Sequence, residues 1–128
     1  MTDHEAIRDV MTRYCWHVDH AEWDSWLALF TLDASWGARG ERAFEGRDAM
    51  MKLTNGLAKK YDPATSARHF TANLLIDLAG DRARLRTYLM TIQPSKEIVR
   101  LGEYDIDLVR RDGKWLMRRL EFSPSGAA

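Results

Sequence analysis

An aspartate at the end of the first predicted helix has the residue type and position needed for proton transfer. Asp19 follows Cys15 by four residues and Met11 by eight, so it lies on the border of that helix's apolar stripe. From this border a carboxylate can reach the protein interior instead of pointing cleanly at water. The alternative is a solvated turn aspartate just ahead of Glu22 and Trp23. On spacing alone, both interpretations stay open.

A histidine is the second candidate, because imidazole exchanges protons near neutral pH. His69 opens a predicted strand in which Thr71 and Asn73 share its face, while apolar side chains occupy the other face. A polar row of this kind is typical of a pocket wall lined with donors, which makes Asn73 a candidate substrate-binding residue. The same row would also suit a solvent-exposed face, with His69 half-buried and hydrogen-bonded.

Aromatic residues supply further candidates for binding and catalysis. Tyr14 lies in the centre of the first helix's apolar stripe, where its hydroxyl either donates to a substrate oxygen or bonds within the core. Tyr88 and Tyr104 lie on long predicted strands, at positions from which they could face a cavity. Trp36 could shape an aromatic pocket for a planar ligand, although a tryptophan at such spacing more often belongs to the core.

Metal and thiol chemistry find little support in the sequence. His17 and His20 are three residues apart on a predicted helix and could chelate a metal, but no H-E-x-x-H motif or cysteine cluster accompanies them. We therefore expect no metal and no cofactor. Cys15 has no cationic neighbour that stands out, which favours a buried bystander over a nucleophile.

Hydrophobic periodicity predicts helices ahead of a sheet. Thr2 and Glu5 form a capping-box pattern at the start of the first helix. From residue 69 the period becomes strand-like, and Gly80-Asp81 and Asp112-Gly113 are tight-turn signals that join consecutive strands into hairpins. The predicted helices span residues 3–20, 23–30 and 47–61, and the predicted strands span residues 33–37, 69–79, 82–93, 98–110 and 115–122, with a loop at 94–97.

Helices followed by an antiparallel meander predict an α+β fold, with the helices segregated to one face of the sheet. We expect a single domain over residues 1–122 and a flexible C-terminal tail over residues 123–128. Lysine plus arginine (19) balances aspartate plus glutamate (19), which gives no electrostatic case for nucleic acid or a membrane surface. No apolar run approaches the ~20 residues that a membrane span needs. A lone cysteine cannot form an internal disulfide, which favours a cytoplasmic protein.

Four short stretches, taken in order, resemble the SnoaL-like (polyketide-cyclase-like) branch of the nuclear-transport-factor-2-like (NTF2-like) superfamily. They are RYCWHVDHAEW from Arg13, LFTLDA from Leu29, EGRDA from Glu45 and RHFTAN from Arg68, and the closing RDGKW from Arg111 resembles the family's last hairpin. The resemblance implies a cone-shaped, curved antiparallel sheet with three N-terminal helices on one face, a cystatin-like roll. It also implies a homo-oligomer, dimer or trimer, and an apolar cavity that opens near Tyr14, Trp36 and His69.

By position, Asp19 and His69 match the Asp–His pair of scytalone dehydratase, hexachlorocyclohexane dehydrochlorinase and bile-acid 7α-dehydratase. These enzymes remove a proton and a leaving group from adjacent carbons. Tyr14 matches the oxyanion tyrosine of ketosteroid isomerase, whereas Ala38 occupies the position of that isomerase's base. The resemblance thus implies a cofactor-free lyase or isomerase for a small, hydrophobic or aromatic, cyclic oxygenated molecule. His69, oriented by Asp19, would abstract a carbon-bound proton, and Tyr14 would stabilise the oxygen that gains charge. The alternatives are a non-catalytic binding or assembly module and a hydrolase on the same fold.

Overall fold

The helices and strands follow the predicted order along the chain. The computed structural model describes residues 1–94, 96 and 98–126. Their elements are α1 (Asp3–Asp19), α2 (Trp23–Leu27), β1 (Phe30–Ala38), β2 (Phe44–Glu45), α3 (Arg47–Ala58), β3 (Arg68–Ala79), β4 (Arg82–Gln93), β5 (Ile98–Arg111) and β6 (Lys114–Pro124). The short strand β2 was not predicted, because two residues are too few to show a period. No helix in these described ranges is long and apolar enough to cross a membrane.

Helix α1 begins with the predicted capping box. The Glu5 backbone N–H donates to Thr2 Oγ1 at 3.1 Å, and the Thr2 backbone N–H donates to the Glu5 carboxylate at 3.0 Å. These reciprocal bonds satisfy donors that the first helical turn would otherwise leave unpaired. The helix buries an apolar stripe that includes Ile7, Met11 and Tyr14, and it ends at Asp19.

The described strands form one curved sheet in the order β2-β1-β6-β5-β4-β3. Strands β3 to β6 make the predicted antiparallel meander, and its hairpins turn at Gly80 and at Asp112-Gly113, which all adopt positive φ. Strand β1 instead runs parallel to β6. The sheet is therefore mixed where we expected a wholly antiparallel one, because β1 returns through α3 and β3–β5 before its partner is reached.

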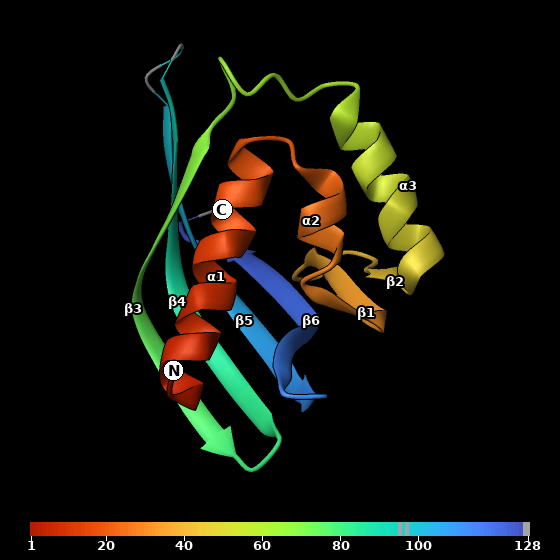
Figure 1. Cartoon of the computed structure of the whole chain (residues 1–128). Coiled ribbons are helices and arrows are strands. Elements are labelled where there is room, and N and C mark those ends of the chain that lie inside the picture. The colour runs from red at the N-terminus through yellow and green to blue at the C-terminus, as the bar shows by residue number, and fades with distance from the viewer. Residues whose placement is uncertain (95, 97, 127–128) are drawn as a thin grey trace.

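The helices lie over the sheet on the side of its buried residues (Figure 1). Helix α1 crosses in front of β3, β4 and β5, while α3 lies beside α2 and contacts β1 and β2. Alternation along β4 turns Leu85, Thr87 and Leu89 toward the helices and leaves the residues between them on the outer face. The sheet's inner face and α1 together enclose the core, as the predicted α+β arrangement requires.

Strand β6 extends further than the sequence pattern indicated. Gly102 pairs with Pro124 and Glu103 with Ser123, and the Ser125 backbone N–H donates to the Leu101 carbonyl at 3.0 Å. Backbone pairing with β5 therefore orders the first part of the expected tail. Residues 127–128 of that tail and residues 95 and 97 of the predicted loop lie outside the described part of the chain.

Candidate functional site

The end of α1 meets the start of β3 through Asp19 and His69. His69 Nδ1 lies 2.7 Å from Asp19 Oδ1. The His69 backbone N–H also donates to both carboxylate oxygens, at 3.1 and 3.2 Å. The structure thus brings together two candidates that are 50 residues apart in the sequence.

This contact determines which imidazole nitrogen is left for chemistry. An ionised carboxylate only accepts hydrogen bonds, so Nδ1 carries the proton of this bond and Nε2 keeps its lone pair. The side chains of His69 and Asp19 are only 16% and 10% exposed, so little water competes for the bond. The arrangement is that of a histidine held in one orientation and one tautomer by a buried carboxylate.

Arg68 ties the same junction together through backbone carbonyls. Its guanidinium donates to the Pro63 carbonyl at 2.6 Å, to the Ser66 carbonyl at 3.3 Å and to the Asp19 carbonyl at 3.4 Å. The loop before β3 and the C-terminal end of α1 are therefore held by one side chain. Arg68 is consequently a positioning group for the pair.

An open pocket of about 480 Å³ lies between α1 and β3 and contains the pair. Residues 12, 15, 16 and 19 supply its α1 wall at helical spacing, and the start of β3 supplies the opposite wall. Two of its aromatic residues are well exposed, Trp16 at 60% and Phe70 at 50%. The pocket is lined by Thr12, Cys15, Trp16, Asp19, His20, Arg68, His69, Phe70 and Thr71.

Comparison with known proteins places this fold and pocket in a family. A family model for the SnoaL-like domain matches residues 1–121. The chain belongs to the SnoaL-like family. Among curated proteins there is no significant match.

Solved structures show the same SnoaL-like architecture with little sequence identity. A candidate scytalone dehydratase from Novosphingobium aromaticivorans is 26% identical, with a TM-score of 0.83 over 96% of this chain and 84% of the other. An NTF2-like protein with a cystatin-like fold from the same species is 21% identical, with a TM-score of 0.85 over 98% and 84%. ActVI-ORFA from Streptomyces coelicolor is 16% identical, with a TM-score of 0.79 over 97% and 98%. The predicted NTF2-like, cystatin-like fold is confirmed.

Several pocket residues of this SnoaL-like protein were missed by sequence reasoning. Thr12, Cys15 and Trp16 precede Asp19 by seven, four and three residues, so helical spacing alone would have placed them on one face with it. His20 was considered only as a metal ligand. Its ring stacks on Trp16 with centroids 4.4 Å apart, and its Nδ1 lies 2.7 Å from the Trp16 carbonyl oxygen.

Cys15 is in the wall of the pocket as a neutral thiol. Burial raises its pKa to about 12, and the nearby Asp19 carboxylate adds to that rise. A thiol with so high a pKa is a poor nucleophile at neutral pH. The position is more interesting than the predicted bystander, but the chemistry is equally inert.

Tyr14, Trp36 and Tyr104 form an aromatic cluster in the core instead of lining this pocket. Trp36 Nε1 donates to the Tyr14 hydroxyl oxygen at 2.9 Å, and the rings of Tyr14 and Tyr104 meet edge to face, 5.5 Å apart. Burial raises the pKa of both tyrosines. The rings of Trp26 and Phe30 pack against Tyr14, so the space that we expected to join Tyr14, Trp36 and His69 is filled on the Tyr14 side.

Tyr88 and Asn73 lie on the outer face of the sheet, away from the Asp19–His69 pocket. Tyr88 is 56% exposed and shares the parity of Arg84 and Arg86 on β4. Asn73 has a positive φ of 59° within a β-bulge between Ala72 and Leu75, which removes it from the face of His69. Neither residue is positioned to bind a substrate of this pocket, in contrast to the prediction.

The histidines weighed as metal ligands have separate partners. His17 Nδ1 lies 3.0 Å from Glu22 Oε1, whereas His20 contacts the Trp16 carbonyl. Within the described ranges, no three or more His, Cys, Asp and Glu side chains are grouped to hold a metal ion. A larger hollow of about 700 Å³ lies on the outer face, but charged side chains that pair with one another dominate its walls. The smaller pocket is therefore the candidate site.

Proposed function

We propose that this SnoaL-like protein is a cofactor-free lyase of the dehydratase type, or an isomerase, that abstracts a carbon-bound proton with His69. The observation that carries the proposal is the triple hydrogen bonding of Asp19 to His69, through Nδ1 and the backbone N–H, inside a pocket. This bonding leaves Nε2 as the free base at the pocket wall. A cytoplasmic location is proposed with it, from the lone cysteine.

The proposed elimination balances with the residues present. Nε2 of His69 takes a proton from the carbon next to a carbonyl, and the electron pair of that C–H bond forms a C=C bond. The C–O bond on the adjacent carbon breaks, and the departing hydroxyl recovers the proton from the imidazolium as water. Asp19 stabilises the imidazolium while it exists. In the isomerase version the proton returns to a different carbon.

The oxyanion role implied for Tyr14 has no geometric support in this pocket. Tyr14 is 2% exposed, its hydroxyl oxygen accepts a bond from Trp36, and it does not line the space beside His69. The mechanism therefore depends on Asp19 and His69 alone for proton transfer. Thr71 and Thr12 are the neutral hydroxyls that the pocket offers to a substrate oxygen.

The pocket walls favour a flat, mainly apolar ring as the substrate. Trp16 and Phe70 expose aromatic surface beside the pair, and stacking against such faces is worth about 0.5–1.5 kcal/mol per contact. The candidate scytalone dehydratase at 26% identity supports elimination over isomerisation. Members of this family bind small organic molecules, which suits a pocket of about 480 Å³.

A bicyclic β-hydroxyketone provides the test, because loss of water from a hydroxytetralone yields a fluorescent naphthol. The wild-type protein should accelerate this reaction, and His69→Gln should reduce the rate by about 100-fold or more. His4→Gln is the matched control, since His4 is exposed at the start of α1. Saturable binding of the ketone without turnover would favour the binding-module alternative, and a full rate in His69→Gln would refute the role of the base.

A further inference from the structure

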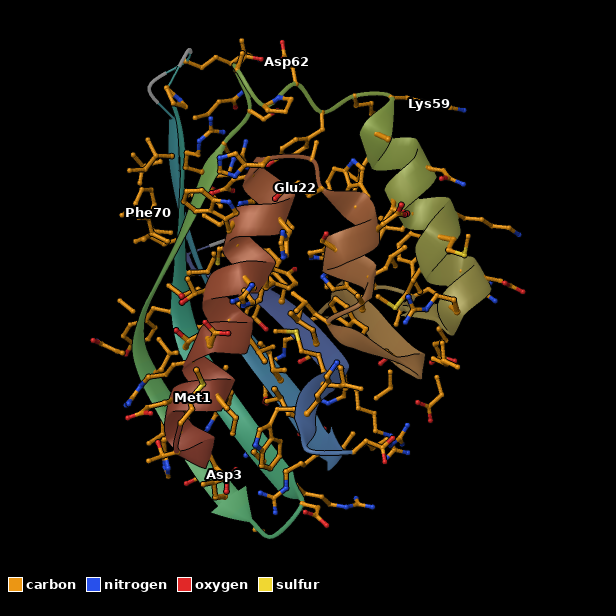
Figure 2. The ribbon with its side chains drawn as sticks, viewed as in Figure 1. Met1, Asp3, Glu22, Lys59, Asp62 and Phe70 are labelled. Carbon is orange, nitrogen blue, oxygen red and sulfur yellow. The ribbon has the colours of Figure 1, made fainter. Side chains whose placement is uncertain are left out.

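The outer face of the sheet carries an exposed apolar patch on β3, β4 and β5. Strand register places Phe70 opposite Met90, and Met90 opposite Leu101, on the face away from the helices. Figure 2 shows Phe70 beyond the ribbon of β3, on the side away from α1. We call this surface the outer-face patch; it consists of Phe70, Leu75, Tyr88, Met90, Val99 and Leu101.

The patch is larger than scattered surface hydrophobics would produce. Its members other than Met90 are exposed by 50% to 59%. Because a large apolar side chain has about 150–250 Å² of surface, these residues leave roughly 450 Å² of contiguous apolar surface in water. An apolar area of that size commonly marks an interaction site.

A β-bulge adds shape to the patch. The bulge at Asn73 keeps Leu75 directly opposite Arg86, on the outer face, where plain alternation would have turned Leu75 inward. Beside it lies a hollow of about 230 Å³, lined partly by Leu75, Tyr88 and Glu103. A hollow next to a projecting aromatic ring is a receptor for a side chain of an opposing surface.

The charges on the rest of this face argue against a highly charged partner. Arg84 pairs with Asp105 at 2.7 Å, Arg119 with Asp107 at 2.7 Å and Arg86 with Asp77 at 3.2 Å. The lower half of the face is therefore neutralised within the chain, and the chain as a whole has a formal net charge of zero. Nucleic acid and anionic membrane surfaces have nothing to attract them here.

The geometry points to a second copy of this chain as the occupant, bound through the same face about a two-fold axis. Strands of 12 residues at about 3.3 Å per residue, four across at about 4.8 Å, give a face of roughly 750 Å². A stable interface needs about 800 Å² per partner. In a two-fold pairing the apolar half meets apolar surface, each hollow can receive a ring from the opposite copy, and no unpaired charge is buried.

The patch also adjoins the candidate site, because Phe70 belongs both to the patch and to the pocket that contains His69. A second copy seated on the patch would cover the outer rim of that pocket. The interface itself does not depend on the proposed function, so its test uses association and not activity.

Sedimentation and light scattering of two leucine variants test the pairing. The wild type at ~100 μM should have twice the 14.8 kDa mass of the chain, and Leu101→Lys should shift it to the mass of one chain. Leu32→Lys is the control, since Leu32 is 73% exposed on β1, outside the patch, and this variant should remain a dimer. Far-ultraviolet circular dichroism confirms that both variants are folded.

Three results would overturn the proposal. They are a wild type that stays at the mass of one chain, an assembly larger than two chains, and a dimer that folded Leu101→Lys leaves unchanged. If Leu101→Lys fails to fold, Tyr88→Lys provides a second variant at an exposed position, and the same mass shift is required of it.

Discussion

Replacing Asp19 by asparagine removes one charge from the candidate site while nearly preserving its shape. Asp19 Oδ1 accepts from both His69 Nδ1 and the His69 backbone N–H, whereas Oδ2 accepts only the backbone N–H at 3.2 Å. An asparagine carbonyl can take the place of Oδ1 and keep two of these bonds. Loss of the third should cost about 1 kcal/mol of unfolding free energy, so the fold should persist.

The effect on rate should be much larger than the effect on stability. At an effective dielectric constant of about 20, unit charges about 4 Å apart attract by about 4 kcal/mol. The pair is mostly buried, with side chains 16% and 10% exposed, so solvent screening removes little of this attraction. A half-developed to fully developed imidazolium then loses about 2–4 kcal/mol of transition-state stabilisation, which corresponds to a rate lower by about 30- to 1000-fold.

The assay measures naphthol formation from the hydroxytetralone alongside thermal unfolding of the same samples. Asp9→Asn is the matched control, because Asp9 lies on the same helix and pairs only with the exposed Arg13 in the bond observed there. The reasoning is refuted if Asp19→Asn retains its rate within about two-fold at an unchanged melting temperature, because Asp19 would then be only a helix-end residue.

Two further predictions concern packing and the buried thiol. Gly102→Ala should lower the unfolding free energy by about 1–3 kcal/mol in a denaturant titration, because its Cβ would lie 2.4 Å from the Phe122 ring and 2.8 Å from the Ser123 carbonyl oxygen. Gly56→Ala, whose Cβ meets nothing within 4 Å on helix α3, should raise it by about 0.5–1 kcal/mol, and the opposite order would contradict the packing argument. Native Cys15 should react with iodoacetamide at least about 100-fold more slowly than the unfolded chain at pH 8, because a pKa raised to about 12 leaves little thiolate. The rate should keep rising with pH through pH ~10, and a plateau near pH ~9 would show an ordinary thiol.

Local signals in the sequence were sufficient for most of the fold. The capping box of Thr2 and Glu5 and the turns at Gly80 and Asp112-Gly113 act within a few residues, and each appears as predicted. The parallel pairing of β1 with β6 joins residues more than 80 positions apart, as in Phe30 with Met117, and no local period encodes it. Register between distant strands is decided by packing of the whole sheet.

The candidate site divides in the same way. Helical spacing indicated that Asp19 could face inward, but only the family resemblance suggested His69 as its partner. Tyr88 could have been recognised as outward-facing, because it shares the parity of the arginines on β4. Asn73 could not, since the bulge that turns it away leaves no mark in an alternating pattern.

The parallel pairing of β1 with β6 also has a consequence for how the chain matures on the ribosome. Strand β1 is complete at Ala38, but its neighbour β6 begins only at Lys114. During synthesis at about 5–20 residues per second, the apolar stripe of α1 and one edge of β1 stay uncovered for several seconds. That interval is when a chaperone would bind the nascent chain, and α1 is the segment that it would cover.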